Sequence, residues 1–388
     1  PRSTPLYSSA ASDVYKRQMF YFASKINRRV DFTHQTFLHK KPTMIRSNNP
    51  DETVLEQRVI RFNDFIPCTT AFIDARTPGS NQKENFCLIG SGVAENPGQV
   101  VHINIPHGFD IGAARQPHGC KNSHHSHDTE EVFIVFSGDW KFTWGQEGED
   151  GEVLLSAGAC ISIPTQMFRG FENVGADDGF MYAVLGLDQS GSAGQVIWAP
   201  YVFHQAKSHG LILLDDGRLI DTVSGAKVPS NAREYTPISK QCADRDFRRL
   251  TTAEMAACVA NKDQHESLQS GGLSALDGVI ERAIIGCANP VENIGAGKMA
   301  WQHGFHLRHL SMQSGVQIPL HVRHEEEVVI VQQGELLVDI EGYTTTLFPG
   351  DVFTAPIDQP RRYLSQAQQP LDAFIVRRGN HPLAAEFV

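Results

Sequence analysis

From about residue 58 onward, short apolar runs alternate with turn residues along the chain. Glycine and proline pairs such as Pro78-Gly79 and Pro97-Gly98 separate the runs. The runs that predict the first strands are Val59–Phe62, Thr70–Asp74, Phe86–Ile89 and Val100–Ile105. Many short strands with such turns are typical of antiparallel sandwiches and barrels. The pattern therefore predicts an all-β architecture for most of the chain.

The pattern changes between residues 199 and 275. Ala199-Pro200 precedes a helical run, Tyr201–His209, which ends at Gly210. Two apolar runs around Asp215-Asp-Gly217 predict a hairpin. Thr251 and Glu254 have the spacing of a capping box and predict a helix that continues through Asn261. We interpret this region as a connector with helices and a hairpin, without chemistry of its own.

Length and charge narrow the class of protein. The chain has 388 residues with 41% hydrophobic residues, enough for two domains with cores of their own. The net charge of -10, without a long basic run, argues against nucleic acid or an anionic membrane as a partner. The apolar runs are too short for a transmembrane helix. The seven scattered cysteines contain no Cys-x-x-Cys pair, which predicts a reducing, cytoplasmic location.

Three residues have the spacing of a metal site. His125 and His127 are two residues apart, so both imidazoles lie on one face of an extended strand. Glu131 has the same parity, and a turn at Asp128-Thr129 would return its carboxylate beside the two rings. Two histidines and one carboxylate leave coordination positions open, as in non-haem iron sites. The alternative is a polar, histidine-rich surface loop.

The spacing around these residues resembles the first motif of the cupin family, Gly-x5-His-x-His-x3-Glu-x6-Gly. Gly119, His125, His127, Glu131 and Gly138 match its fixed positions. The resemblance implies jelly-roll β-barrels, with the three ligands holding a metal inside the first barrel. Fe(II) is the metal that we expect, with Mn, Ni or Zn as alternatives.

A second stretch resembles the second cupin motif but departs from it in two places. Gly158, Pro164 and Asn173 match, whereas Gln166 replaces a glycine and Arg169 stands where the family has a fourth histidine ligand. Arginine has no lone pair for a metal. Arg169 is therefore expected either to bind an anionic substrate or to form a structural pair with Glu172 or Glu131, the latter in a barrel that never binds metal.

The second half of the chain repeats both motifs with a changed ligand set. His321 and Glu327 match the first motif, but Arg323 replaces its second histidine and Arg361 the fourth. Such a pocket fits an internal ion-pair network or an anion site better than a metal. His324 is out of phase with the ligand positions unless a bulge shifts the strand.

The repeat gives the expected division of the chain. Residues 45–198 form a metal-competent cupin barrel, residues 199–275 the connector, and residues 276–388 a second barrel with a degenerate ligand set. Residues 1–44 are a suspected non-native or disordered leader, because residues 1–18 resemble translated sequencing-adapter sequence. The fold class is thus two tandem cupin jelly-roll barrels.

Three functions are compatible with these residues. The resemblance to gentisate-type and quercetinase-type cupin dioxygenases implies an oxidoreductase that acts on a small organic anion, an aromatic or keto acid, held by Arg169. The first alternative is a metal-free cupin that binds an anionic metabolite through Arg169, His321, Arg323 and Arg361. The second is a metal-dependent lyase or isomerase. A homodimer is expected from the architecture alone.

Overall fold

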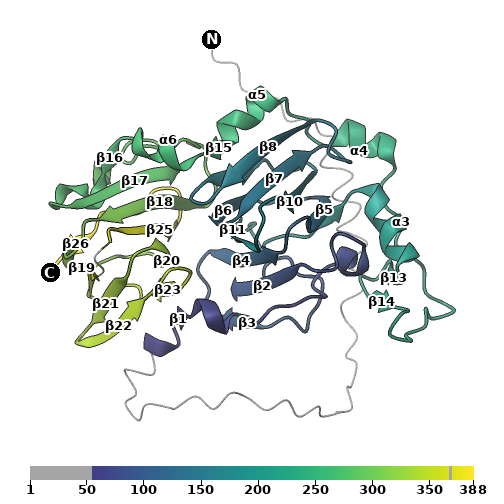
Figure 1. The fold of residues 1–388 in the computed structure, drawn as a ribbon, viewed down its shortest axis with the longest axis horizontal. Coiled ribbons are helices and arrows are strands. Elements are labelled where there is room, and N and C mark those ends of the chain that lie inside the picture. Colours follow the sequence, from purple (N-terminus) through teal and green to yellow (C-terminus); the bar gives the residue numbers. More distant parts are fainter. Residues whose placement is uncertain (1–54, 367–368) are drawn as a thin grey trace.

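The computed structural model describes residues 55–366 and 369–388. The suspected leader, residues 1–44, lies outside the described residues. Two β-barrels stand side by side, and the helices lie along the outer edges of both (Figure 1). The prediction of an all-β fold with two tandem barrels is confirmed. Among the described helices, none combines the length and the apolar character that a membrane crossing needs.

Each barrel consists of one seven-stranded and one five-stranded sheet. The strands of the first barrel follow in spatial order. In the larger sheet they are β15 (Val259–Ala260), β9 (Cys160–Ile163), β6 (Glu131–Ser137), β11 (Gly179–Gly186), β4 (Phe109–Gln116), β2 (Glu84–Ile89) and β3 (Val101–Ile103). In the smaller sheet they are β12 (Ile197–Trp198), β5 (Lys121–Ser126), β10 (Arg169–Asn173), β7 (Asp139–Trp144) and β8 (Gly151–Ser156).

The second barrel repeats this order strand for strand. Its larger sheet contains β1 (Val59–Ile60), β23 (Val352–Ala355), β20 (Glu327–Gln333), β25 (Leu371–Arg378), β18 (Phe305–Met312), β17 (Val279–Ile285) and β16 (Ser270–Gly271). Its smaller sheet contains β22 (Tyr343–Leu347), β21 (Leu336–Ile340), β24 (Arg361–Ser365), β19 (Gln317–Val322) and β26 (Glu386–Phe387). β5 and β19 begin at residues 121 and 317, which are 196 residues apart, and the same distance separates His125 from His321.

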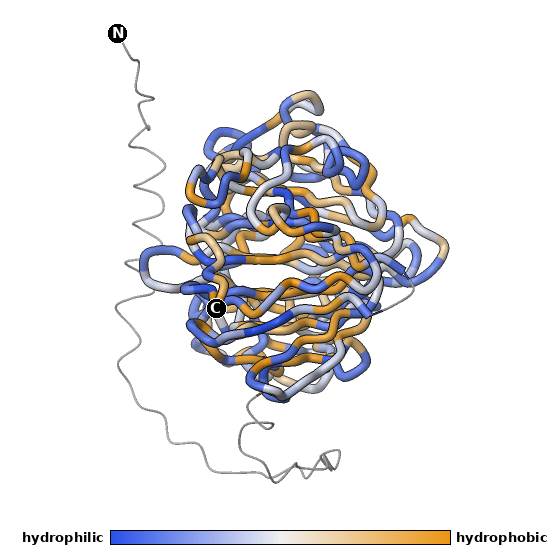
Figure 2. Tube along the Cα trace, turned by 90° about the vertical axis from the view of Figure 1, so that its left-hand side faces the viewer, coloured by the Kyte–Doolittle hydropathy of each residue, from blue (hydrophilic) through white to orange (hydrophobic). Residues whose placement is uncertain are grey.

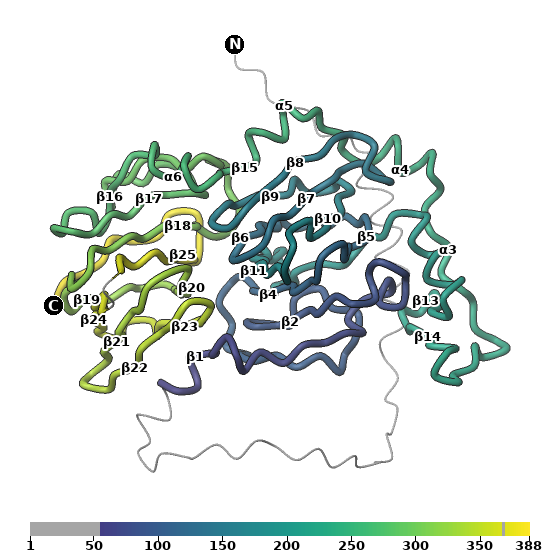
Figure 3. The backbone as a smooth tube through the Cα atoms, viewed as in Figure 1, coloured from purple at the N-terminus to yellow at the C-terminus, as the bar shows by residue number. Residues whose placement is uncertain are grey.

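The connector holds most of the helical structure. Its elements are α3 (Pro200–Ser208), β13 (Leu211–Leu213), β14 (Leu219–Asp221), α4 (Lys240–Asp246), α5 (Thr252–Met255), η3 (Ala256–Cys258), α6 (Lys262–Glu266) and η4 (Gly272–Ala275). The remaining short helices are η1 (Phe62–Asp64), η2 (Ile73–Arg76) and η5 (Pro290–Glu292). The predicted helix after residue 200, the hairpin and the capping box are all present. In Figure 3, α3 and the hairpin flank the first barrel.

Three local expectations differ from the structure. The strand expected at residues 70–74 is wrong, because Ile73–Arg76 turns into a 3-10 helix in which the buried Asp74 pairs with Lys83. The helix expected to run from Thr252 to Asn261 ends at Cys258, after which Val259–Ala260 pair with β9. The strand at Val59–Ile60 was expected in the first barrel, but it pairs with β23 of the second.

The two barrels therefore exchange edge strands. β1, at the start of the described chain, completes the larger sheet of the second barrel, and β15, from the connector, completes that of the first. Figures 1 and 3 show β1 between the two barrels, with β23 of the second barrel on one side and β3 of the first on the other. Each barrel thus depends on a segment from the other half of the sequence.

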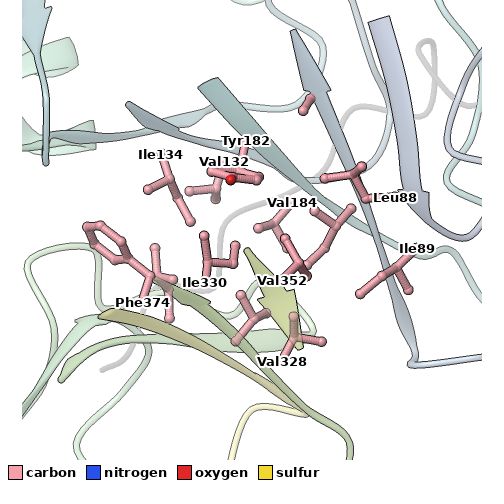
Figure 4. Packing of buried hydrophobic residues seen from close by; sticks show 14 of the residues in the cluster. Leu88, Ile89, Val132, Ile134, Tyr182, Val184, Val328, Ile330, Val352 and Phe374 are labelled. Carbon is pink, nitrogen blue, oxygen red and sulfur yellow. The ribbon is translucent and has the colours of Figure 1, made fainter. Parts of the chain in front are cut away.

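The larger sheets of the two barrels pack face to face. Val132 and Ile134 of β6 point into this interface together with Val328 and Ile330 of β20, and all four side chains are buried (Figure 4). The intervening Phe133 of β6 points instead into the interior of the first barrel. Strands that are buried on both faces are continuously apolar, as the central runs in Figure 2 are.

The packing between the two barrels leads to a prediction about the cooperativity of unfolding. Ile330→Ala should lower the free energy of unfolding by about 2–5 kcal/mol, because it leaves a cavity between the barrels. Because the barrels share this core and exchange strands, both should still unfold in one transition. Urea unfolding followed by far-UV circular dichroism measures this, with Leu154→Ala on the exposed side of β8 as a control. Two separate transitions, of which only one shifts, would contradict the shared core.

Candidate metal centre

The predicted ligands converge inside the first barrel. His125 lies on β5, His127 follows the end of that strand, and Glu131 begins β6 after the turn at residues 128–129. Their ligand atoms all lie within 4.8 Å of one another, and all three side chains are buried. This is the one cluster of its kind among the described residues. The alternative of a histidine-rich surface loop is therefore wrong.

Both imidazoles are held in the tautomer that leaves Nε2 free to bind a metal. His125 Nδ1 lies 2.7 Å from the carbonyl oxygen of Ser123, and His127 Nδ1 lies 2.9 Å from that of Gln195. A carbonyl can only accept, so each Nδ1 carries the proton and each Nε2 keeps its lone pair. His127 Nε2 lies 3.8 Å from Glu131 Oε1. The nitrogen lone pairs and a carboxylate oxygen are thus presented together.

Burial keeps the two rings neutral. Loss of solvent, followed by the positive charge of Arg169, lowers the pKa of His127 to about 4 and holds the pKa of His125 well below its usual value. Neutral imidazole is the form that binds a metal, so neither ring would have to lose a proton at neutral pH. The donor set therefore fits a transition-metal ion.

Arg169 pairs with Glu131. Its guanidinium donates to Glu131 Oε2 and, at 2.8 Å, to the carbonyl oxygen of His125. This pairing was one structural alternative to binding a substrate, whereas the pair expected with Glu172 is not formed, because Glu172 contacts Lys121 and Lys141 instead. Since Arg169 uses Oε2, the other oxygen, Oε1, stays directed at His127. Metal-binding carboxylates commonly have such a partner on the second oxygen.

The loop before β10 holds the backbone of His127 through a hydrogen bond. Gln166 stands at the position where the second motif has glycine, and it still adopts φ of 58°, in the left-handed region. Its backbone N–H donates to the carbonyl oxygen of His127 at 2.7 Å. A non-glycine residue in this region is costly unless its surroundings hold it there. The departure from the motif thus preserves the backbone shape.

Several residues at the site gave no signal in the sequence. The ring of Trp198 lies 5.1 Å from that of His125, and its indole N–H donates to Glu95 at 2.7 Å. Burial raises the pKa of Glu95 to about 7, although this hydrogen bond opposes the shift. Asn122 contacts His125 Nδ1 at 3.3 Å and accepts from the buried Lys83 at 2.7 Å. Asn122 lies within the first motif. Trp198, Glu95 and Lys83 come from other segments, whose distance from the motif along the sequence follows no pattern.

The second barrel contains an ion-pair network at the equivalent position. Arg361 donates to Glu327 at 3.0 Å, as Arg169 does to Glu131. Arg323, at the position of His127, lies 3.4 Å from Glu327 and also donates to Glu292 at 3.1 Å. His321 Nδ1 lies 2.9 Å from the carbonyl oxygen of Pro319, as the Nδ1 atoms of His125 and His127 lie near carbonyl oxygens in the first barrel. A guanidinium thus lies where a metal would need a ligand.

The network extends beyond the four residues that the sequence predicted. Four buried arginines pair with four carboxylates: Arg308, Arg323, Arg361 and Arg377 with Glu281, Glu292, Glu325 and Glu327. The opposite charges balance, so the prediction of an internal ion-pair network describes this barrel. His324 lies apart from it, at the surface beside Asp358 and Glu386. Arg169 lies in the other barrel, so it cannot share one pocket with His321, Arg323 and Arg361.

Comparison with known proteins agrees with this architecture. A model of the cupin domain matches residues 114–185 and 308–377. The chain carries two cupin domains. Oxalate decarboxylase of Lactobacillus farciminis, solved in complex with formate, is 12% identical with a TM-score of 0.50 over 85% of this chain and 88% of that chain. A second oxalate decarboxylase structure, which concerns the substrate binding mode, is 11% identical with a TM-score of 0.50 over 90% and 88%.

The 7S globulin of Momordica charantia is also similar, at 11% identity and a TM-score of 0.49 over 86% of this chain and 87% of that chain. No curated protein matches the sequence. At identities this low, the decarboxylase structures show that the fold of the two-domain cupin is shared. They do not transfer an activity.

The Arg169–Glu131 pair leads to the prediction of a stability effect that depends on metal. Arg169→Met should lower the free energy of unfolding of chelator-treated protein by about 3–5 kcal/mol, because Glu131 would remain buried without a partner. The double variant Arg169→Met with Glu131→Leu should recover part of the loss. Urea unfolding with and without added metal measures both. A single variant as stable as the wild type would show that Glu131 does not need the guanidinium.

The network in the second barrel predicts sensitivity to acid. Burial opposes the ionisation of Glu292, but the charges of Arg377, Arg308 and Arg323 outweigh it and hold the pKa of Glu292 below its usual value. A lowered folded-state pKa adds stability that is present above the unfolded-state pKa and declines as the pH falls below about 5.

Glu292→Gln should therefore cost about 3–5 kcal/mol at pH 7 and make the decline below about pH 5 shallower. Urea unfolding across this pH range measures it, with Glu152→Gln on the exposed side of β8 as the matched control. An unchanged pH dependence in Glu292→Gln would mean that the network does not control acid stability.

Proposed function

We propose that the first barrel holds a transition-metal ion on His125, His127 and Glu131 and that the protein is a metal-dependent oxidoreductase. The observation that carries the proposal is the tautomer of both imidazoles, fixed by two backbone carbonyls so that each Nε2 is a lone-pair donor beside Glu131. His321 has the same contact with a carbonyl, but only at His125 and His127 do two such rings and a carboxylate bring their ligand atoms within 4.8 Å of one another among the described residues.

The reaction that we propose is of the dioxygenase type, on a small organic anion such as an aromatic or keto acid. A bound redox metal, Fe(II) in our proposal with Mn or Ni as alternatives, would supply coordination positions for substrate and dioxygen, since two imidazoles and one carboxylate leave such positions open. The resemblance of the first motif to gentisate-type and quercetinase-type cupins supports this choice. Zn, the remaining alternative, has no redox chemistry and would fit only the lyase or isomerase. A lyase or isomerase would use the same ligands without consuming oxygen.

The protein's own residues would prepare the site in three ways. His125 and His127 enter it already deprotonated at Nε2, because burial lowers the pKa of each ring. Arg169 orients Glu131 and compensates its charge when no ion is present. Phe133 and the other apolar side chains of the barrel wall exclude water from this side.

Arg169 would act on the substrate indirectly in this arrangement. Its two terminal nitrogens are engaged by Glu131 and by the His125 carbonyl, whereas its Nε is buried without a partner among the described residues. Direct anchoring of an anion by the bidentate face of Arg169 would require the Glu131 pair to open. We therefore propose orientation of Glu131 as its main role and expect Arg169→Lys to alter metal affinity more than substrate affinity.

The first experiment is metal analysis of untagged protein by inductively coupled plasma mass spectrometry. We expect near-stoichiometric transition metal in the wild type and a loss of at least about tenfold in His125→Ala, because one of three ligands is removed. His321→Ala, the equivalent change in the second barrel, is the matched control and should keep the metal.

Metal retained in His125→Ala, or no metal in either barrel after anaerobic reconstitution, would contradict the proposed centre. If metal is bound, an oxygen electrode with aromatic and keto acids separates the redox reaction from a lyase or isomerase reaction. Turnover without oxygen uptake would overturn the oxidoreductase and leave the metal centre in place.

A further inference from the structure

A cavity opens beside the three ligands within the first barrel. The centre of a water-sized sphere can move through about 70 Å³ of it, and His125, His127 and Glu131 lie in its wall. The rest of the wall is mostly apolar and includes Phe72, Phe86, Phe133, Phe171, Leu185 and Trp198. Within the described part of the chain, no lysine or arginine lines it. Any cation that meets a bound molecule here would therefore have to be the metal.

Two amide side chains in this wall have a buried end without a partner. Asn85 Nδ2 and Gln99 Oε1 are both enclosed, and neither has a hydrogen bond in the described structure. The third amide of the wall, Asn122, is already engaged by Lys83. A buried polar atom without a partner is costly, and a bound molecule can supply the missing hydrogen bond.

The two amides lie on the side of the cavity away from the ligands. Asn85 is on β2, which is three strands from β6 and its Glu131 in the order β6-β11-β4-β2. Strands are spaced about 4.8 Å apart, so this separation is about 14 Å along the sheet. Gln99 precedes β3, the next strand beyond β2. The cavity is thus polar at its two ends and apolar between them.

We infer that the substrate of this site has an anionic, metal-binding head, an apolar and ring-sized body, and a neutral hydroxyl-like group at its far end. This inference rests on the proposed function for the head and on the cavity wall for the rest. A hydroxyl group can accept from Asn85 Nδ2 and donate to Gln99 Oε1, so it satisfies both amides. A second carboxylate at the far end would lose its hydration without meeting a cation.

Three para-substituted benzoates test the far end of the cavity. They are 4-hydroxybenzoate, benzoate and terephthalate, which carry a hydroxyl group, a hydrogen atom and a second carboxylate at the same place. Isothermal titration calorimetry with the metal-analysed full chain gives their dissociation constants. We expect 4-hydroxybenzoate to bind about fivefold more tightly than benzoate. Terephthalate should bind more than about tenfold more weakly than benzoate.

Variants of the amides assign the effect to these residues. Asn85→Leu and Gln99→Leu should each remove most of the advantage of 4-hydroxybenzoate over benzoate and leave the affinity for benzoate within about twofold. Val100→Leu, next to Gln99 but exposed, is the control and should change neither affinity. A hydroxyl advantage that survives both amide variants would overturn the assignment, as would terephthalate binding as tightly as 4-hydroxybenzoate.

The outcomes separate this inference from the proposed metal centre. Protein without metal that still distinguishes the three benzoates through Asn85 and Gln99 would overturn the metal centre and keep the assignment of the far end. Metal-loaded protein that binds all three equally, or none at millimolar concentration, would overturn the inference and keep the metal centre.

Discussion

A buried arginine–glutamate pair at the centre of each barrel is the interaction on which the rest of the structure depends. Glu131 belongs to the larger sheet of its barrel and Arg169 to the smaller one, so the pair joins the two sheets across the interior. Arg361 and Glu327 do the same in the second barrel. Either charge alone would be strongly destabilising at this depth, so both must be present. The barrels share this pair and differ in what surrounds it.

The residue at one motif position accounts for the difference between the two barrels. In the first barrel the residue two after the first histidine is His127, which leaves a lone pair directed at Glu131. In the second barrel it is Arg323, which brings a permanent positive charge to Glu327 and recruits further carboxylates. In the function that we propose, one barrel accepts a cation from solution, whereas the other carries its cation on a side chain. The same backbone thus serves an open site and a closed one.

Much of this arrangement could be predicted from the sequence, because the spacing of motif residues determines which face of a strand their side chains share. The positions of His125, His127 and Glu131, and the repeat with its altered ligands, follow from such spacing. The partners that orient the site do not, because Gln195, Trp198 and Glu95 reach it from segments whose distance in sequence is unconstrained. The choice of Arg169 between substrate and Glu131 also depended on side-chain packing, which no pattern of residue types specifies.

The exchange of edge strands has a consequence for how such a chain is assembled. The strand that precedes each repeat, β1 before the first and β15 in the connector before the second, completes the barrel of the other repeat. The unit that is duplicated in the sequence is therefore not the unit that closes a barrel. A chain with one repeat alone could complete its larger sheet only by accepting the strand of a second copy, as in a domain-swapped dimer. In these terms the protein is such a dimer made covalent, with the connector as the link between its subunits.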